Sequence, residues 1–179
     1  DYIIPLKGVE EMIKSLDDEN SLKFFVYHDK VAIESGSITL ITKLLSGDYP
    51  DVERVIPEQT AQTVTLHRDE LITLLRQVAL FTTEMSHSVR FTFSQGELAL
   101  CATSSEVGEG KVSMPVDFFG DTIEIAFNPF YFIDILKHCK DETVKFGLSD
   151  AYNPGLITDS STALFVLMPM RLAAGVNAT

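Results

Sequence analysis

The sequence contains no tryptophan and only two cysteines, Cys101 and Cys139. Two cysteines cannot build the disulfide framework of a small secreted domain, and they suit a reducing compartment. No apolar run approaches the roughly 20 residues that a membrane-spanning helix needs, so we expect no membrane association. The first residue is Asp1 rather than methionine, and the strand-like segment 2–4 follows it directly. We therefore expect the chain to be a piece of a longer protein.

Basic residues are scarce, with 14 Lys and Arg against 26 Asp and Glu, so the formal net charge is −12. This balance excludes nucleic-acid binding by bulk charge, because such binding requires clustered cations that neutralise phosphates. Any contact with nucleic acid has to come from the local placement of a few cations. A length of 179 residues is enough for one good core and part of a second.

The motifs of catalysis are also missing. The four histidines are scattered without metal-ligand spacing, and neither a phosphate-binding loop nor a nucleophile elbow occurs. Cys101 lies in an apolar strand pattern and Cys139 on the apolar stripe of a helix pattern, so we expect both to be buried packing residues. No catalytic residue, metal site or cofactor is predicted, and an enzyme ranks last among the functional alternatives.

Hydrophobic periodicity predicts two units of helices and strands. The first unit has a helix at 6–16, strands at 22–27, 31–34 and 37–44, and an extended, non-helical segment at 46–57. The second unit has helices at 68–83 and about 129–138, with Asn128 as N-cap of the latter, and strands at 63–66, 89–94, 97–103, 110–116, 122–127, 143–148, 155–159 and 162–168. Residues 57–62 are the expected linker between the units.

The two ends of the chain repeat each other. The apolar stripes of the first and last helices match at one constant offset (132 − 9 = 123), with Val9, Met12, Ile13 and Leu16 against Phe132, Ile135, Leu136 and Cys139. The repeat predicts an α+β fold of β-α-β-β-β modules, used twice per domain, with helices on one face of curved antiparallel sheets. The expected domains are half a domain at 1–60 and a complete one at 61–172, followed by a disordered tail at 173–179.

Six of the fourteen Lys and Arg residues fall on or at the ends of the three predicted helices, which the repeat places on one side of the sheets. They are Lys7, Lys14, Arg68, Arg76, Lys137 and Lys140. Such a face can touch DNA phosphates without reading sequence. Acidic residues share these helices, so a merely solvated face is the alternative.

Apolar residues without a place in the core suggest two contact surfaces. The closing stretch 164–172 starts as a strand, which Pro169 stops, and its methionines beside Arg171 suit an adaptable groove for apolar side chains. The segment 49–55 is expected to line the same groove near the domain boundary. Leu80 and Phe81 lie partly off the core stripe of their helix and are expected to face another subunit.

Three motifs resemble the bacterial sliding clamps, the β subunits of DNA polymerase III. They are Gly47-Asp48-Tyr49-Pro50-Asp51 with Arg54-Val55-Ile56-Pro57, the helix start Phe127-Asn128-x-x-Tyr131, and the closing Val166-x-Met168-Pro169-Met170-Arg171-Leu172. The resemblance covers residues 1–172. It implies the DNA-clamp fold, with the latter half of the family's middle domain and its whole C-terminal domain.

The resemblance implies a processivity factor of DNA replication, without enzymatic activity, in the bacterial cytoplasm at the nucleoid. Its subunits form a homodimeric ring around duplex DNA, bound without sequence preference. A clamp loader opens the ring, and replicative and repair DNA polymerases are tethered to it. Because the preceding domains are missing here, we expect this chain alone to be a monomer or a non-native dimer. The alternative from another class is a structural or adhesive repeat protein without a DNA role.

The resemblance also implies the sites. Partners insert a Gln-Leu-x-Leu-Phe-like peptide into a groove between the middle and C-terminal domains. The family's groove positions fall on Pro50, Arg54, Val55, Asn128, Tyr131, Tyr152, Pro154, Val166, Leu167, Met168, Pro169, Met170, Arg171 and Leu172. The subunit interface falls on Leu80 and Phe81 with Glu106 and Glu109 of an acidic loop, and Lys7 falls on an inner helix. Ser86 stands where many relatives carry an aromatic residue on the groove rim.

Overall fold

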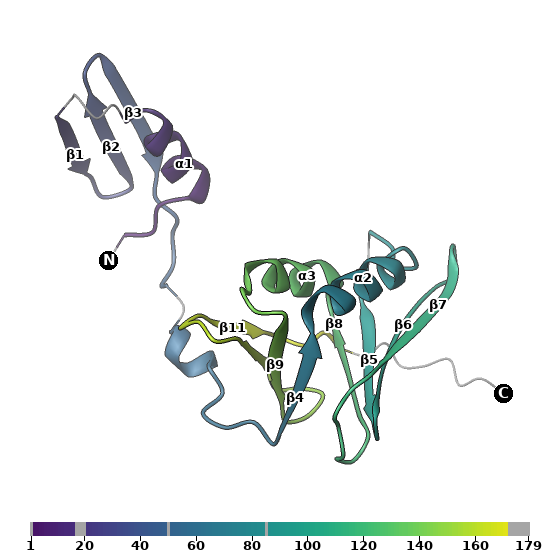
Figure 1. Ribbon diagram of the computed structural model, residues 1–179. Coiled ribbons are helices and arrows are strands. Elements are labelled where there is room, and N and C mark those ends of the chain that lie inside the picture. The colour runs from purple at the N-terminus through teal and green to yellow at the C-terminus, as the bar shows by residue number, and fades with distance from the viewer. Residues whose placement is uncertain (1, 17–20, 50, 85, 172–179) are drawn as a thin grey trace. The chain divides into compact units, whose positions relative to one another are not determined.

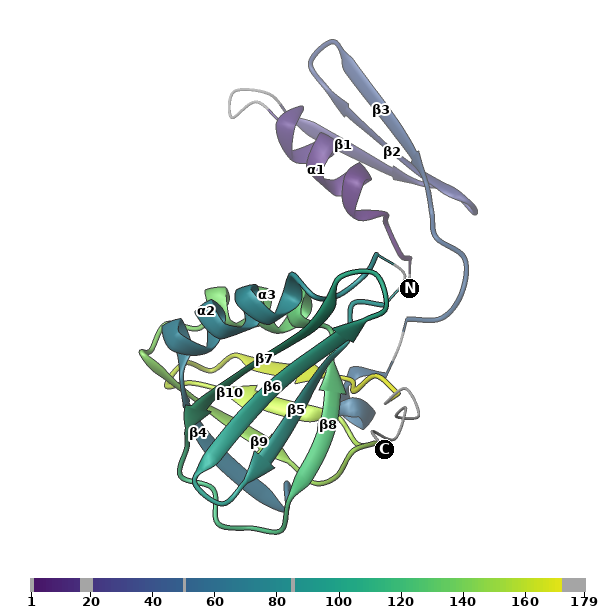
Figure 2. The same cartoon turned by 90° about the vertical axis from the view of Figure 1, so that its right-hand side faces the viewer.

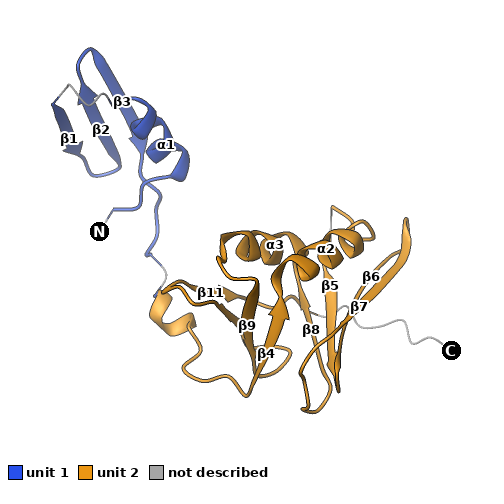
Figure 3. Ribbon diagram, viewed as in Figure 1, with its two compact units in different colours: residues 1–51 blue, residues 52–179 orange. Residues whose placement is uncertain are grey.

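The computed structural model describes residues 2–16, 21–49, 51–84 and 86–171. The chain divides into two compact units, Asp1–Asp51 and Val52–Thr179 (Figure 3). This division precedes the linker expected at 57–62, because the 52–61 segment belongs with the second unit: the Ala61 N–H donates to Ser149 Oγ over 3.2 Å. The segment expected to be non-helical contains a short 3-10 helix, η1 (Val52–Val55), so that expectation was wrong there.

The first unit consists of one helix and one antiparallel sheet. Helix α1 (Leu6–Lys14) is followed by β1 (Leu22–Val26), β2 (Lys30–Ser35) and β3 (Ile38–Lys43), in the sheet order β1-β2-β3. Met12 packs on Val31 and Ile33 in a small core. The rest of the predicted stripe is less covered, since Ile13 is 64% exposed and this unit offers only one sheet to bury it.

The second unit holds two modules of the same element order. The first module is β4 (Gln62–His67), α2 (Arg68–Ala79), β5 (Val89–Ser94), β6 (Glu97–Ser104) and β7 (Gly108–Pro115). The second is β8 (Ile123–Phe127), α3 (Pro129–His138), β9 (Thr143–Leu148), β10 (Gly155–Thr158) and β11 (Leu164–Leu167). All strand pairs are antiparallel, so the predicted succession of strands around two helices is confirmed.

The two modules exchange their first strands. Strand β4 pairs with β9, and β8 pairs with β5, which gives the sheets β11-β10-β9-β4 and β7-β6-β5-β8. Helices α2 and α3 lie side by side along one edge of these sheets (Figures 1 and 2). Each module therefore closes only with its neighbour, and the helices form a layer of their own.

The ends of the helices follow from local hydrogen bonds. Asn128 caps α3 as predicted, since its Oδ1 accepts the Phe130 N–H over 2.9 Å, and Pro129 takes the first helical position. Helix α2 stops at Ala79 and does not reach 83. The N–H groups of residues 80–82 donate to carbonyls three residues back, and this tighter 3-10 turn ends the helix.

A phenylalanine cluster fills the core between the sheets and the helices. Phe91, Phe127, Phe132 and Phe146 are fully buried, and their rings pack edge-on or stacked at centroid distances of 5.1–5.8 Å. Cys139 is buried as expected, whereas Cys101 is only half-buried. Strand alternation explains the correction, because Leu100 and Ala102 take the core face of β6 and leave Cys101 on the other.

One backbone hydrogen bond occurs at the equivalent place in both units. In the second unit the Met170 N–H donates to the Ala126 carbonyl over 2.7 Å, which ties the end of the module to the strand before its helix. In the first unit the Leu45 N–H donates to the Ile3 carbonyl over 2.8 Å. The strand expected at 2–4 is thus a single bridge, since the described residues offer it no strand comparable to β5. Among the described helices, none is long and apolar enough to cross a membrane.

Candidate functional site

The closing stretch of the chain joins the two sheets of the second unit. Strand β11 belongs to one sheet, and Met170, three residues after it, bridges to Ala126 in β8 of the other. Pro169 has no N–H for a ladder and stands at the point where the chain leaves β11. Met168 is 58% exposed, and Pro169 and Met170 are half-buried. Two polarizable thioethers are thereby held at the surface by a fixed backbone.

Two hollows flank this stretch, and both are formed within the second unit. The first has a volume of about 560 Å³ and is lined by Ala151, Tyr152, Pro169, Met170 and Arg171. The second has a volume of about 530 Å³ and is lined by Arg54, Val55, Ile56, Pro57, Glu58, Gln59, Ser149, Asn153, Pro154 and Met168. Each hollow combines one methionine with proline and one guanidinium. That lining suits an apolar side chain whose neighbouring backbone or carboxylate needs a hydrogen-bond donor.

The structure brings together most of the predicted groove residues. Eight of them line one hollow or the other: Arg54, Val55, Tyr152, Pro154, Met168, Pro169, Met170 and Arg171. Val166 is half-buried and Leu167 buried in β11, where they support the stretch from beneath. Pro50 and Leu172 lie outside the described residues.

Asn128 and Tyr131 lie at the start of α3. The Oδ1 atom of Asn128 caps the helix, and Tyr131 is 63% exposed. With its Oδ1 engaged in this cap, the amide nitrogen of Asn128 is the donor that it could offer to a bound peptide. Neither residue belongs to the lining of the hollows described above.

Several lining residues have no counterpart among the predictions. Glu58 and Gln59 follow η1, and Ser149, Ala151 and Asn153 belong to the turn between β9 and β10. These segments are polar turns without periodicity, so pattern analysis offers no reason to bring them together. Ile56 and Pro57 were visible as part of a motif, but the motif did not reveal which way they face.

The predicted DNA-facing cations occupy the helices in unequal ways. Arg76, Lys137 and Lys140 are exposed, on or just after α2 and α3. Lys7 and Lys14 are exposed on α1, where Lys14 pairs with Glu11 over 2.8 Å. Lys7 and Lys14 belong to the first unit, whereas the other cations belong to the second.

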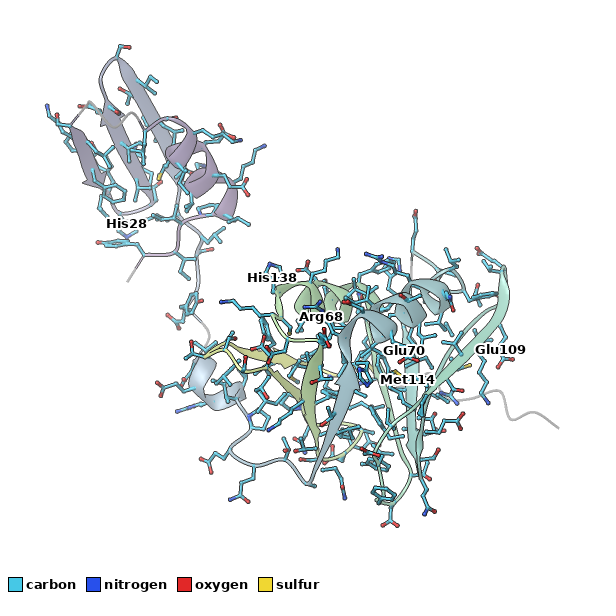
Figure 4. The ribbon with its side chains drawn as sticks, viewed as in Figure 1. His28, Arg68, Glu70, Glu109, Met114 and His138 are labelled. Atoms are coloured by element: carbon cyan, nitrogen blue, oxygen red, sulfur yellow. The ribbon has the colours of Figure 1, made fainter. Side chains whose placement is uncertain are left out.

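Arg68 differs from the other five cations, because a hydrogen bond links it to the end of α3. Figure 4 labels its side chain. Its Nε donates to Asp69 Oδ1 over 2.8 Å and its Nη1 to the Cys139 carbonyl over 3.0 Å, and its side chain is 23% exposed. The hydrogen bond from Arg68 also lowers the pKa of Asp69. This guanidinium is committed to the end of α3 and is a poorer phosphate ligand than its neighbours.

The predicted interface residues gather along strand β7, an edge of its sheet. Leu80 is 74% exposed, and the Phe81 ring packs so closely on Gly110 of β7 that a Cβ atom there would overlap it. Glu109 lies in β7 and Glu106 in the turn before it, both exposed. The structure thus brings an apolar residue, two carboxylates and an open strand edge to one place.

Outside the hollows, burial and hydrogen bonds explain the shifted pKa values of titratable groups. Among the described residues, no group of three or more His, Cys, Asp or Glu side chains could hold a metal ion. Burial raises the pKa of the Cys101 and Cys139 thiols. Asp159 accepts hydrogen bonds from the Ser161 hydroxyl, the Lys140 N–H and the Ser161 N–H, and its pKa falls to about 2. These hydrogen bonds tie the turn after β10 to the end of α3.

The chain is similar to DNA polymerase III beta subunits along nearly all of its described length. Residues 53–171 match the sequence profile of the DNA polymerase III beta subunit, C-terminal domain, and residues 1–51 match that of the central domain. The beta sliding clamp of Chlamydia muridarum is 58% identical over 172 residues, which are 96% of this chain and 47% of that protein. The beta sliding clamp of Vibrio cholerae is 31% identical over 173 residues, which are 95% of this chain and 47% of that protein.

A solved structure shares the fold. The sliding clamp (DNA polymerase III subunit beta) from Bartonella birtlesii, bound to griselimycin, has a TM-score of 0.77 at 30% identity, over 96% of this chain and 47% of that chain. The α+β fold of repeated modules expected from the sequence is therefore confirmed. The chain spans about half the length of the curated relatives it matches.

Proposed function

The chain belongs to the DNA polymerase III beta subunit family, and from that premise we propose that it is part of a sliding clamp. In this proposal the protein encircles duplex DNA, has no catalytic activity and needs no cofactor. It tethers replicative and repair polymerases, which reach it through a peptide-binding groove. Its place is the bacterial cytoplasm, at the nucleoid.

One observation carries this proposal: the same partly exposed stretch, Met168–Arg171, lines both hollows. Two neighbouring apolar subsites suit an extended peptide with two apolar anchors a few residues apart, such as Gln-Leu-x-Leu-Phe. Methionine can adapt its shape to leucine or phenylalanine, and proline keeps the surface rigid. Arg54 and Arg171 stand at the hollows as donors for the peptide's carbonyls.

The exposed cations Lys7, Lys14, Arg76, Lys137 and Lys140 support a role toward DNA. They are few, and the chain is acidic, so each contact to phosphate is weak and independent of sequence. Such contacts permit sliding, whereas retention on DNA must come from closure of a ring. The DNA-facing role of Arg68 is kept here only as a secondary one, because its guanidinium already binds Asp69 and the Cys139 carbonyl.

The edge at β7 supports the proposed homodimer. An edge strand of eight residues presents unpaired N–H and C=O groups, and the exposed Leu80 stands beside it. A second subunit could cover both at once, with Glu106 and Glu109 toward basic residues of the partner. A clamp loader would open the ring at this interface.

The test is fluorescence anisotropy of a labelled Gln-Leu-x-Leu-Phe peptide, titrated with the protein carrying all the family's domains. We expect binding in the micromolar range, about −8 kcal/mol. Met168→Glu should weaken it at least about tenfold, since it places a charge among apolar groups. Leu164→Glu is the matched control, because Leu164 lies in the same strand region, is 55% exposed and lines neither hollow.

Two outcomes would contradict the proposal. A folded wild-type protein that binds no peptide would remove the partner groove, and a structural repeat without partners would be the better account. Equal losses for Met168→Glu and Leu164→Glu would place the binding elsewhere.

A further inference from the structure

The turn between β9 and β10 contributes to the lining of both hollows. Ala151 and Tyr152 line the first hollow, whereas Ser149, Asn153 and Pro154 line the second. One short segment thus contributes to both proposed subsites. Its conformation fixes how far apart the two subsites are.

Burial contributes little to holding this turn. Tyr152 is 85% exposed, Asn153 is exposed, and Ala151 is only half-buried. At its entry, Ser149 Oγ accepts the Ala61 N–H, and at its exit Gly155 begins β10. Polar contacts must therefore fix the residues between these two points.

Asp150 supplies those contacts from a single carboxylate. Its Oδ1 accepts the Tyr152 N–H over 2.7 Å and the Asn153 N–H over 2.8 Å. Its Oδ2 accepts the Asn153 side-chain amide over 2.7 Å. These three hydrogen bonds lower the pKa of Asp150, as expected for a carboxylate that is bound in its charged form.

We propose that Asp150 is the positioning residue of the peptide groove. It holds one lining residue of each hollow, Tyr152 of the first and Asn153 of the second, without lining either hollow itself. This inference rests on the proposed peptide-binding function of the two hollows. The distance between the subsites, and with it the affinity for a peptide with two anchors, then depends on one carboxylate that lies outside the contact surface.

The side chains of Asp150 and Asn153 allow a test by exchange. Asp150→Ala removes all three hydrogen bonds. Asn153→Asp alone sets two carboxylates against each other. The double variant D150N/N153D restores the pair with donor and acceptor reversed: the new amide oxygen at 150 accepts the two backbone N–H groups, and its amide nitrogen donates to the new carboxylate at 153. The net charge of the chain is unchanged in the double variant.

The measurement is peptide anisotropy for these variants in the protein with all family domains, beside Tm and amide hydrogen exchange. We expect Asp150→Ala to weaken binding about tenfold, with Tm nearly unchanged and faster exchange of the Tyr152 and Asn153 amides. Asn153→Asp should also weaken binding, in part because it places a carboxylate at the second hollow. The double variant carries the same carboxylate, so it should bind more tightly than Asn153→Asp and regain the slow amide exchange of residues 152 and 153, as coupled neighbours do. Asp121→Ala, at an exposed acid in another loop, should bind like wild type.

The outcomes separate the two proposals. Wild-type binding with an unchanged Asp150→Ala affinity would overturn the positioning role and leave the groove intact. A double variant that binds no better than Asn153→Asp and keeps its fast amide exchange would also overturn it, because the effect would not come from the hydrogen bonds. Absence of wild-type binding would overturn the proposed function and, with it, this inference.

Discussion

Hydrogen bonds lower the pKa of Asp159 strongly. Hydrogen bonds from the Ser161 hydroxyl and from the Lys140 and Ser161 N–H groups lower its pKa from 3.8 to about 2. A carboxyl group with a depressed pKa in the folded state stabilises the fold above its unfolded pKa, and this contribution is lost as the pH falls through the folded value.

We therefore predict that the Tm difference between wild type and Asp159→Asn is full at pH 7 and shrinks between about pH 4 and pH 2. Calorimetry at several pH values measures it, with Asp121→Asn as a control at an exposed acid. A difference that stays constant down to pH 2 would show that the Asp159 hydrogen bonds do not depend on its charge.

Gly110 is packed directly against the Phe81 ring. Since a Cβ atom at this buried glycine would overlap the Phe81 ring, Gly110→Ala must displace Phe81 from its place beside β7. Overpacking of this kind costs about 1–3 kcal/mol.

We expect urea unfolding to show that loss for Gly110→Ala, and less than about 0.5 kcal/mol for Ser113→Ala at an exposed site of the same strand. If Gly110→Ala leaves both the stability and the proposed subunit interface unchanged, Phe81 does not depend on this contact.

At the scale of elements, Arg68 connects the start of α2 with the end of α3. Its guanidinium donates a hydrogen bond to the Cys139 carbonyl at the C-terminus of α3, where helices have unsatisfied acceptors. We predict that Arg68→Ala lowers Tm by a few degrees, whereas Arg76→Ala, at an exposed site of the same helix, leaves it nearly unchanged. Thermal unfolding of the two variants measures this. Equal Tm values for the two variants would show that the contacts of Arg68 do not stabilise the fold.

The elements show which features sequence patterns can predict. The periodicity of Leu71, Leu75 and Val78 located α2, and Asn128-Pro129 located the start of α3, because each depends on neighbours along the chain. The end of α2 and the single bridge at Ile3 were missed, since they depend on tertiary partners.

The candidate site was predictable only in part for the same reason. Met168–Arg171 and Arg54-Val55 were visible as motifs. The turn that lines both hollows carries no periodic signal, and the proposed role of Asp150 depends on a hydrogen-bond pattern that the spacing of residues does not reveal.

At the scale of the molecule, the two units differ in how much core they have. The buried cluster of the first unit consists of Met12, Val31 and Ile33, and every residue of β1 is exposed, including Phe24 at 49%. The second unit has a continuous core over two sheets and two helices. A unit with so little buried apolar area is expected to open first.

We predict that hydrogen exchange of this chain shows faster exchange in residues 22–43 than in β5, β6 and β9. Mass spectrometry of the labelled peptides measures it. Equal protection in both units would indicate that something covers the apolar face of β1, and sedimentation of the same sample would then reveal whether a second copy does so.

The proposed role as part of a sliding clamp has a direct topological test. The protein with all the family's domains would be loaded by its clamp loader and ATP onto nicked circular DNA, washed at high salt, and its retention measured before and after the DNA is cut once. We predict retention on the circle and loss on linearisation, because a ring held by closure and not by phosphate contacts slides off a free end. Retention that is equal on circular and linear DNA, or absent from both, would contradict the account.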